Sequence, residues 1–508
     1  MVFKKGFDTD KYVEEQTKYI QERVAKFDKK LYIEFGGKLL FDFHAARVLP
    51  GYDPNAKIKV LQALGENVEI IFCVNAGDIQ NSRIVGSLGI TYADFTLKMI
   101  DDLRSYKLNV STVVISMFSG QSAALQMKQF LENKGLKVYT TGIISGYPNN
   151  IELIASKEGY GAEPFIETSK PIVIVTGAGP NSGKMSTCLK MVYQDKGRDI
   201  DSGYAKFETF PIWNLPLDHP INVAYEASTA DLKDLNLIDP HHLGAYDKVA
   251  VNYNRDVENF VIIQKILKSI ISKDNFMNAY HSPTDMGVNM ARTGITDDEA
   301  CQEAAKQEVI RRYFRHNQEY ILGQERLETV EVEEKLMHKV GLKIIDRSVV
   351  SPARKAAEEA KEKNKGNKGV YCGAAVELTD GRIVSGKNSP LLHAESATIL
   401  NAIKVLANIP DEIKLIPENI IQRIKDFKFN AYSEDAENLD VEQALTALAV
   451  STGTNPTAKL ALEQLPKLKN TEMHITHIPK KGDESPIRKL GINLTTDGKI
   501  GGGKLYLE

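Results

Sequence analysis

The sequence predicts an α/β protein with a mostly parallel, doubly wound N-terminal sheet, a central helical subdomain and a C-terminal α/β domain. Three observations support this. Strand-like and helix-like segments alternate up to about residue 255, helices without strands follow, and strand-like segments return at Gly369. The 508 residues also exceed what one hydrophobic core serves. We therefore expect domains at residues 1–255, 256–355 and 369–508.

Short apolar runs rich in β-branched residues predict the buried strands of the first domain. They are Leu31–Phe35, Val68–Val74, Thr112–Met117, Leu136–Tyr139, Ile172–Thr176, Ile221–Tyr225 and Lys248–Asn252. Between them, Tyr92–Leu103 and Gln121–Leu131 carry apolar residues three and four positions apart. This spacing places the apolar side chains on one face of a helix, which we expect to cover the sheet.

The central region has helical periodicity alone. Asn259–Ile271, Asp297–Arg315 and Gln324–Val340 are amphipathic, with no strand-like run between them. The following Lys355–Lys368 is charged, lacks large apolar residues and contains glycine and asparagine near its end. We expect it to be a solvated helix end followed by a linker.

The composition excludes several classes of protein. The net charge of −3 gives no overall positive field for nucleic acid or an anionic membrane, and no apolar run approaches the ~18 residues of a membrane span. No apolar stretch follows the N-terminal lysines, so we expect no signal peptide. The four cysteines form no CxxC pair. We expect a cytoplasmic homo-oligomer whose partner is a small phosphorylated ligand rather than nucleic acid or membrane.

Residues 171–192 predict a strand, a glycine-rich loop and a helix that bind phosphate. Glycines allow several backbone N–H groups to converge on an anion, the helix start adds its free N–H groups and dipole, and a lysine supplies a mobile positive charge. The expected binding residues are Gly177, Gly179, Asn181, Ser182, Gly183, Lys184, Ser186 and Thr187. The alternative is a glycine-rich turn with a surface lysine.

This loop departs from the standard G-x-x-x-x-G-K-[ST] pattern. Five residues separate Gly177 from Gly183, and Met185 occupies the position of the magnesium-binding hydroxyl. The longer spacing resembles loops of the dethiobiotin-synthetase-like branch of P-loop proteins. We expect Ser186 to bind Mg²⁺ together with a carboxylate at the end of a neighbouring strand. Glu226 is the expected carboxylate, with Asp231 next, and Lys184 and Glu226 are the expected catalytic residues; alternatively, Glu226 only adjoins a helix start.

Other predicted strand ends also carry polar residues, and ligands of doubly wound folds bind at that edge. These residues are Asn75, Asp78, Asn81, Arg83, Ser119, Gly120, Asn252, Arg255, Asp256, His44 and Arg47. Each taken alone fits a turn or a helix cap better than a ligand site, and their accumulation at one predicted edge is what favours a ligand cleft there. A further loop, containing His281, Thr284 and Asp285, is either a lid over the cleft or an ordinary structured loop.

The C-terminal domain resembles the cytidine deaminase fold. Residues 369–402 predict a strand, an Asp380-Gly381 turn, a second strand, and a helix that opens with His393-Ala394-Glu395. In that family, a residue two positions before the glutamate binds zinc, the glutamate shuttles protons, and two cysteines from a PCxxC helix start complete the site. Here Thr454–Pro456 is the best counterpart of that start, and no cysteine follows Cys372. We therefore expect no zinc, and Glu395 to act as an acid/base or merely to cap its helix.

The whole chain is similar to the bacterial uncharacterised protein family 371. The resemblance rests on YIEFGGKLLFDFHAARVLPGY, GAGPNSGKMSTCL, HSPTDMGVN, CGAAVEL and SPLLHAESA. It implies an N-terminal α/β part, a helical part and a deaminase-like part, and it brings no established activity. Three functions remain open: a nucleotide-dependent transferase or hydrolase, a non-catalytic nucleotide sensor, and a metal-independent enzyme using the deaminase-like domain.

Overall fold

The protein divides into two compact units in a computed structural model that describes residues 4–27, 30–85, 90–208, 210–432 and 438–501. The first unit comprises residues 5–305, and the second comprises residues 306–508 together with residues 1–4. The three-domain division expected from composition stays a prediction.

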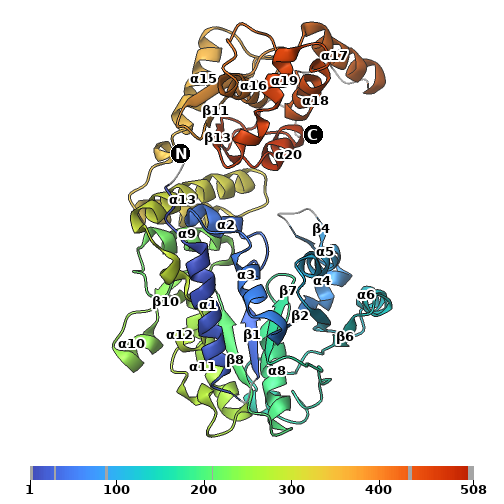
Figure 1. The fold of residues 1–508 in the computed structure, drawn as a ribbon, viewed down its shortest axis with the longest axis vertical. Helices are drawn as coiled ribbons and strands as arrows, with labels where there is room; N and C mark the ends of the chain where they lie inside the picture. Colours follow the sequence, from blue (N-terminus) through green and yellow to red (C-terminus); the bar gives the residue numbers. More distant parts are fainter. Residues whose placement is uncertain (1–3, 28–29, 86–89, 209, 433–437, 502–508) are drawn as a thin grey trace. The chain divides into compact units, whose positions relative to one another are not determined.

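A six-stranded parallel sheet forms the centre of the first unit and confirms the predicted fold class (Figure 1). Its strands are β1 (Leu31–Phe35), β2 (Val68–Asn75), β5 (Val110–Ser116), β6 (Lys137–Thr140), β7 (Ile172–Gly177) and β8 (Gly203–Phe207), in the order β6-β5-β2-β7-β1-β8. Five of them match predicted strands. We did not predict β8, because Lys206 interrupts its apolar run.

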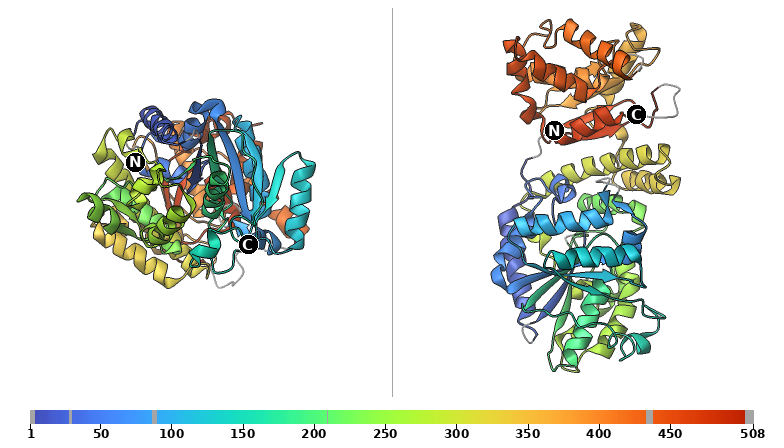
Figure 2. Two further views of the ribbon diagram at one scale, coloured as in Figure 1. Left: turned by 90° about the horizontal axis from the view of Figure 1, so that it is seen from below. Right: turned by 90° about the vertical axis from the view of Figure 1, so that its right-hand side faces the viewer.

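Successive strands along the chain are added to this parallel sheet first toward one edge and then toward the other. From β1 through β2 and β5 to β6 the chain moves toward one edge, and from β7 to β8 it moves toward the other. Right-handed crossovers place the connecting helices of the two directions on opposite faces. Accordingly, α5 (Tyr92–Ser105) packs on β2 and β5, and α8 (Lys184–Lys196) packs on β1, β7 and β8 (Figures 1 and 2). The two directions part between β2 and β7, where doubly wound folds bind their ligands.

Two predicted strands of the first unit are corrected. Ile221–Tyr225 lies in the helix α9 (Pro220–Ser228), because Pro220 occupies a first helical position and His219 accepts a hydrogen bond from the N–H of Ile221. A short buried apolar run fits a strand and a helix equally well, so periodicity did not distinguish them. Lys248–Asn252 contributes to β10 (Val251–Tyr253), which pairs with β9 (Asn236–Ile238) in a separate two-stranded sheet.

The remaining elements of the first unit surround these sheets. They are α1 (Thr9–Val24), α2 (Phe43–Val48), α3 (Ala56–Ala63), α4 (Ala76–Gln80), β3 (Ile84–Val85), β4 (Ile90–Thr91), α6 (Ser122–Asn133), α7 (Ile151–Ile154), α10 (Pro240–Tyr246), α11 (Asn254–Ile270) and α12 (Pro283–Met286). Buried Arg23 connects α1 with the segment before and within α12, since its guanidinium donates to the Tyr280 hydroxyl and the Asp285 carbonyl, each at 2.9 Å.

The second unit contains a four-stranded mixed sheet in the order β12-β11-β13-β14. The strands are β11 (Gly373–Glu377), β12 (Ile383–Lys387), β13 (Glu472–Ile475) and β14 (Asn493–Thr496). The helices are α13 (Asp298–Ile321), which begins in the first unit, α14 (Leu327–Lys339), α15 (Val350–Glu362), α16 (Ala394–Leu406), α17 (Glu418–Tyr432), α18 (Val441–Ser451), α19 (Pro456–Leu462) and α20 (Lys481–Lys489). No helix among the described residues is long and apolar enough to cross a membrane.

The segment predicted as a solvated helix end and linker does contain a helix end, because α15 stops at Glu362 and residues 361–365 are exposed, but one face of the helix is packed. In α15, Ala353, Ala356 and Ala360 are buried, and the helix contacts β11 and β12. A β-carbon on Gly373 would overlap the carbonyl oxygen of Ala353, so helix and strand approach very closely. Alanine methyl groups supply this face, which is why the lack of large apolar residues was misleading.

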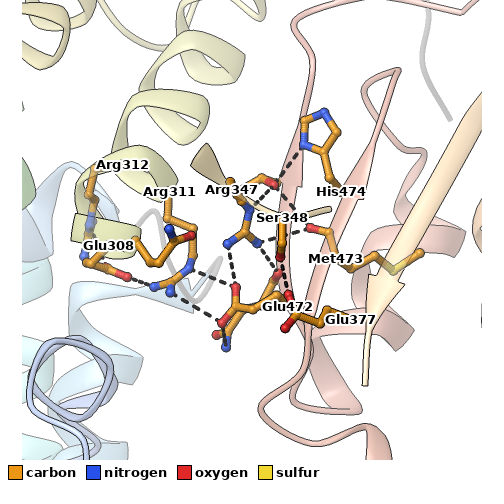
Figure 3. Close-up of polar contacts among 12 residues, drawn as sticks. Glu308, Arg311, Arg312, Arg347, Ser348, Glu377, Glu472, Met473 and His474 are labelled. Atoms are coloured by element: carbon orange, nitrogen blue, oxygen red, sulfur yellow. Dashed lines mark hydrogen bonds and ion pairs between the residues drawn. The ribbon is translucent and has the colours of Figure 1, made fainter. Parts of the chain in front are cut away.

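A buried ionic network holds the sheet of the second unit to its preceding segments (Figure 3). Arg347 is 1% exposed, and its guanidinium donates to Glu472 at 2.6 Å, to the Thr495 hydroxyl at 2.9 Å and to the Asn493 carbonyl at 2.9 Å. Arg311 of α13 also pairs with Glu472, at 3.3 Å. The network thus joins α13 and the segment before α15 to β13 and β14.

Candidate functional site

The predicted strand, loop and helix form as expected, with β7 ending at Gly177 and α8 beginning at Lys184. Between them, Gly179 and Gly183 adopt positive φ angles of 80° and 86°, as does Asn181 at 58°. Residues other than glycine rarely adopt this left-handed backbone conformation, although asparagine tolerates it better than most. The residue types therefore fit the turns that bring the chain from the strand into the helix.

The N-terminus of α8 has no side-chain cap among the described residues. Gly183 is its N-cap residue, and the first intrahelical bond runs from the Thr187 N–H to the Gly183 carbonyl at 3.0 Å. The N–H groups of Lys184, Met185 and Ser186 precede that bond and have no intrahelical acceptor. Free N–H groups and the positive end of the helix dipole together favour an anion.

The Lys184 side chain folds back across the loop. Its Nζ lies 3.2 Å from the Gly179 carbonyl oxygen and 3.3 Å from the Ser182 hydroxyl. No carboxylate pairs with this ammonium among the described residues, so a bound phosphate would exchange weak neutral acceptors for a charged one. Charge-assisted hydrogen bonds of that kind are about twice as strong as neutral ones.

Two neighbouring strand ends contact the loop. Asn75, at the end of β2, donates to the Asn181 carbonyl at 3.2 Å, and Ser116, at the end of β5, donates to the Ser182 carbonyl at 2.9 Å. Asn75 was a predicted strand-end residue, and the structure brings it to the loop. We missed Ser116, whose only signal was its place at the end of a predicted strand.

The predicted hydroxyl ligands point elsewhere. Thr187 is buried and lies 3.8 Å from the Cys73 sulfur, while Ser186 lies beside the hydroxyl of Tyr160. With Met185 between Lys184 and Ser186, the helix start offers no hydroxyl directed at the loop. The donor set around the loop thus fits a phosphate group better than a magnesium ion held by the protein.

Glu226 does not occupy the position that its assignment required. It lies near the C-terminal end of α9, 5% exposed, instead of at the end of a strand next to β7. One of the two strands that adjoin β7 is β1, where Glu34 pairs in register with Val175 of β7. Glu34 accepts a hydrogen bond from the Tyr204 hydroxyl at 2.7 Å. A lone carboxylate within an apolar strand was the sequence signal for Glu34, and we overlooked it.

A charged cluster lies at the end of β8, on the other side of β1. Lys206 pairs with Asp256 at 2.5 Å and with Glu208 at 2.9 Å, and Arg255 pairs with Asp234 at 3.1 Å. Burial raises the pKa of Glu208 to about 7 despite the attraction of Lys206, whereas that same attraction outweighs burial and lowers the pKa of Asp256. The predicted strand-end residues Arg255 and Asp256 therefore belong to an internal ionic cluster.

The other strand-end residues make local contacts. Asp78 pairs with Arg83 at 3.3 Å, Asn81 ends α4, and Ser119 and Gly120 precede α6. His44 of α2 packs against the ring of Tyr225. The same helix, α2, also carries Arg47.

The segment with His281, Thr284 and Asp285 forms a structured loop containing α12, which is one of the two interpretations that the sequence left open. The Thr284 hydroxyl accepts from Asn252 at 2.8 Å, the Asp285 carboxylate accepts from the backbone N–H of His281 at 2.8 Å, and the backbone N–H of Val288 donates to the carbonyl of Lys206 in β8. This segment thus lies along the edge strand β8, away from the β2–β7 boundary.

Comparisons with known proteins match the full length of the chain. Residues 5–341 match the N-terminal model of the domain of unknown function DUF1846, and residues 345–506 match its C-terminal model. A UPF0371 protein of Clostridium botulinum (strain Eklund 17B / Type B) is 49% identical over 501 residues, covering 99% of both chains. UPF0371 proteins of Clostridium tetani (strain Massachusetts / E88) and of Clostridium botulinum (strain ATCC 19397 / Type A) are 49% and 50% identical, again over 99% of both chains.

The chain belongs to the UPF0371 family. This confirms the family resemblance seen in the sequence. UPF0371 proteins are uncharacterised, so the family name assigns neither the glycine loop nor the C-terminal unit a function. The deaminase resemblance of that unit stays a prediction.

Proposed function

We propose that this UPF0371 protein binds the phosphate groups of a nucleotide or another phosphorylated ligand through the loop of residues 177–184. The observation that carries the proposal is the uncapped start of α8, preceded by left-handed Gly183 and covered by Lys184. The loop lies beside the boundary between β2 and β7, where the order in which strands are added to the sheet changes direction. Doubly wound folds bind their ligands at the carboxyl edge of the sheet at such a boundary, which supports a ligand here. Asn75 and Ser116 fix the loop carbonyls from the neighbouring strands, which favours a preformed binding site.

Phosphoryl transfer is the further step of this proposal. Such chemistry rests mainly on positioning and on neutralising the charge of the transferred group. The N–H groups of α8 and Lys184 would bind and orient the phosphates. A magnesium ion accompanying the nucleotide would neutralise further charge, and Glu34 is the carboxylate of the neighbouring strand that could orient its water ligands.

A panel of nucleotides, pyrophosphate and inorganic phosphate, each with and without Mg²⁺, tests binding by thermal unfolding. A ligand at 100 times its dissociation constant should add about 2.7 kcal/mol to the stability of the folded protein. Lys184→Ala should abolish the shift, whereas Lys265→Ala, which removes an exposed lysine of α11, should retain it. The proposal fails if no phosphorylated ligand shifts the unfolding of the wild type.

A non-catalytic nucleotide sensor is the second candidate. The methionine at position 185 and the directions of Ser186 and Thr187 favour it, because a poor metal site impairs turnover more than affinity. For a sensor, ligand binding should be largely independent of Mg²⁺, and a coupled phosphate-release assay should show no turnover. Turnover that depends on both Lys184 and Mg²⁺ would select the transferase or hydrolase instead.

A further inference from the structure

Three side chains of the second unit form a compact polar cluster that the phosphate site does not use. His393 is the N-cap residue of α16, and Glu395 follows in the first turn of that helix. Asp483 comes from the first turn of α20, and one of its carboxylate oxygens lies 2.7 Å from Nδ1 of His393. One nitrogen or oxygen atom from each of the three residues lies within 4.8 Å of the other two.

Glu395 is the unusual member of this cluster. It is 5% exposed, and no other described residue donates a hydrogen bond to its carboxylate. Buried polar groups are nearly always paired, since an unpaired one costs about 1–3 kcal/mol or more. A buried carboxylate that lies beside a second carboxylate and an imidazole, with no hydrogen bond from another described residue, is stabilised either by a proton or by a cation from outside the chain.

We propose that His393, Glu395 and Asp483 bind one divalent transition-metal ion of the zinc class. One imidazole nitrogen and two carboxylate oxygens are ligand types that this class accepts. The two carboxylates carry the charge that a divalent cation neutralises. Three protein ligands would also leave a position for water, as catalytic zinc sites do.

The surroundings of the cluster position the ligands. The second Asp483 oxygen accepts a hydrogen bond from the backbone N–H of Val441 at 2.9 Å, at the start of α18. The backbone N–H of His393 donates to the Leu439 carbonyl at 2.9 Å, which fixes the start of α16. Such outer contacts orient metal ligands, and their loss typically weakens binding about 10–100-fold.

Protons would replace the metal in the metal-free protein. Burial raises the pKa of Glu395 to about 8, with a further contribution from Asp483. Burial alone would lower the pKa of His393, but its hydrogen bond with Asp483 outweighs burial and raises it. Two other titratable groups face the cluster, and burial raises the pKa of both Asp440 and Cys372. Metal affinity at ligands of these types generally rises with pH, because an imidazole and carboxyl groups must lose their protons to bind an ion.

This site differs from the one that the deaminase resemblance suggested. The expected counterpart of the cysteine pair, at residues 454–456, is directed elsewhere, because Asn455 caps α19 and donates to the Leu415 carbonyl. Asp483, which we did not single out in the sequence, supplies the third ligand instead. The expectation that the chain binds no zinc rested on the missing cysteines, and the present site needs none.

Metal analysis of the full-length protein tests the proposal. We expect one Zn²⁺ or Co²⁺ per chain, a raised unfolding temperature with either ion, and Co²⁺ absorption bands typical of a low coordination number. Glu395→Gln keeps the shape of the side chain and resembles its protonated form, so the variant should fold. Its affinity for the metal should fall at least about 10–100-fold, the range that even outer contacts account for. Asp483→Asn should have the same effect.

Two control variants test whether a loss of metal binding is specific to this cluster. His316→Gln removes a different buried imidazole of the same unit, which bonds to Glu333 at 2.7 Å, and should leave metal binding unchanged. Lys184→Ala should also leave it unchanged, since the phosphate loop is a separate proposal. The metal site is disproved if the wild type binds neither Zn²⁺ nor Co²⁺ at one ion per chain, or if Glu395→Gln and Asp483→Asn bind them as tightly as the wild type.

Discussion

A β-carbon on Gly183 would lie 2.7 Å from the β-carbon of Ser116. Real β-carbon contacts are essentially never this short, so the start of α8 and the end of β5 approach each other as closely as a glycine allows. Gly183 is also left-handed, with φ at 86°. Both features place the free N–H groups of α8 against the carboxyl edge of the sheet.

Gly183→Ala should therefore destabilise the first unit more than the replacement of a left-handed glycine that has no close neighbours. The left-handed backbone costs an alanine about 1–2 kcal/mol, and the contact with Ser116 should add about 1–3 kcal/mol of overpacking. Gly65→Ala is the matched control, because Gly65 has φ at 65° and a β-carbon there would meet no other atom within 4 Å. Urea unfolding of both variants measures the difference, and equal losses would contradict the close approach.

The phosphate loop was predictable because its residues carry their own conformational requirements. Gly179, Gly183 and the β-branched strand before them specify a turn and a helix start without reference to the rest of the fold. The partners of the loop were less predictable, since Ser116 reaches it only through the order of the strands. Glu226 shows the opposite error, in which a buried apolar run was assigned to a strand and its flanking carboxylate was placed at the wrong edge. Asp483 was invisible for the same reason as Ser116, because about ninety residues separate it from His393.

Glu34 rather than Glu226 should influence the use of magnesium. If a nucleotide binds with Mg²⁺, Glu34→Gln should weaken the Mg²⁺-dependent part of binding by about tenfold or more, as changes near bound metals do. Glutamine keeps an acceptor for the Tyr204 hydroxyl, so the strand contact is retained. Titration of Mg²⁺ at fixed nucleotide concentration, followed by thermal unfolding, measures this. Glu226→Gln should behave like the wild type, and the reverse pattern would restore the original assignment.

Arg347 should be required for the stability of the second unit. Arg347→Leu would leave buried Glu472 with Arg311 as its one charged partner among the described residues, besides the Asn493 amide, and breaking a buried ion pair typically costs about 3–5 kcal/mol. Arg347→Lys should lose part of this stability, because an ammonium does not reproduce the bonds of the guanidinium to four acceptors. Calorimetric unfolding gives the comparison, with Arg382→Ala as the control. Arg382 pairs with Asp380 at the surface, so its removal should change the unfolding little.

The same network predicts sensitivity to acid. Burial alone would raise the pKa of Glu472, but attraction to Arg311 and Arg347 outweighs burial and lowers it. A carboxylate with a lowered pKa in the folded state stabilises the protein above the ordinary pKa of about 4.3, and this contribution is lost as the pH falls below that value. Stability measured from pH 7 to pH 3 should fall less steeply in Glu472→Gln than in the wild type. Parallel curves would show that Glu472 does not titrate in this range.

Glu395 should make the stability of the metal-free second unit decline as the pH rises toward 8. Its pKa is raised to about 8, so between the ordinary value near 4.3 and pH 8 the folded state binds more protons than the unfolded state. Stability from this group is therefore present at low pH and declines as the pH rises through that interval. The raised pKa of His393 acts in the same direction. Unfolding of metal-free Glu395→Gln from pH 5 to pH 9 should show a shallower decline than the wild type, because glutamine does not titrate. A wild-type stability that rises over this range would contradict the protonated state assigned to Glu395.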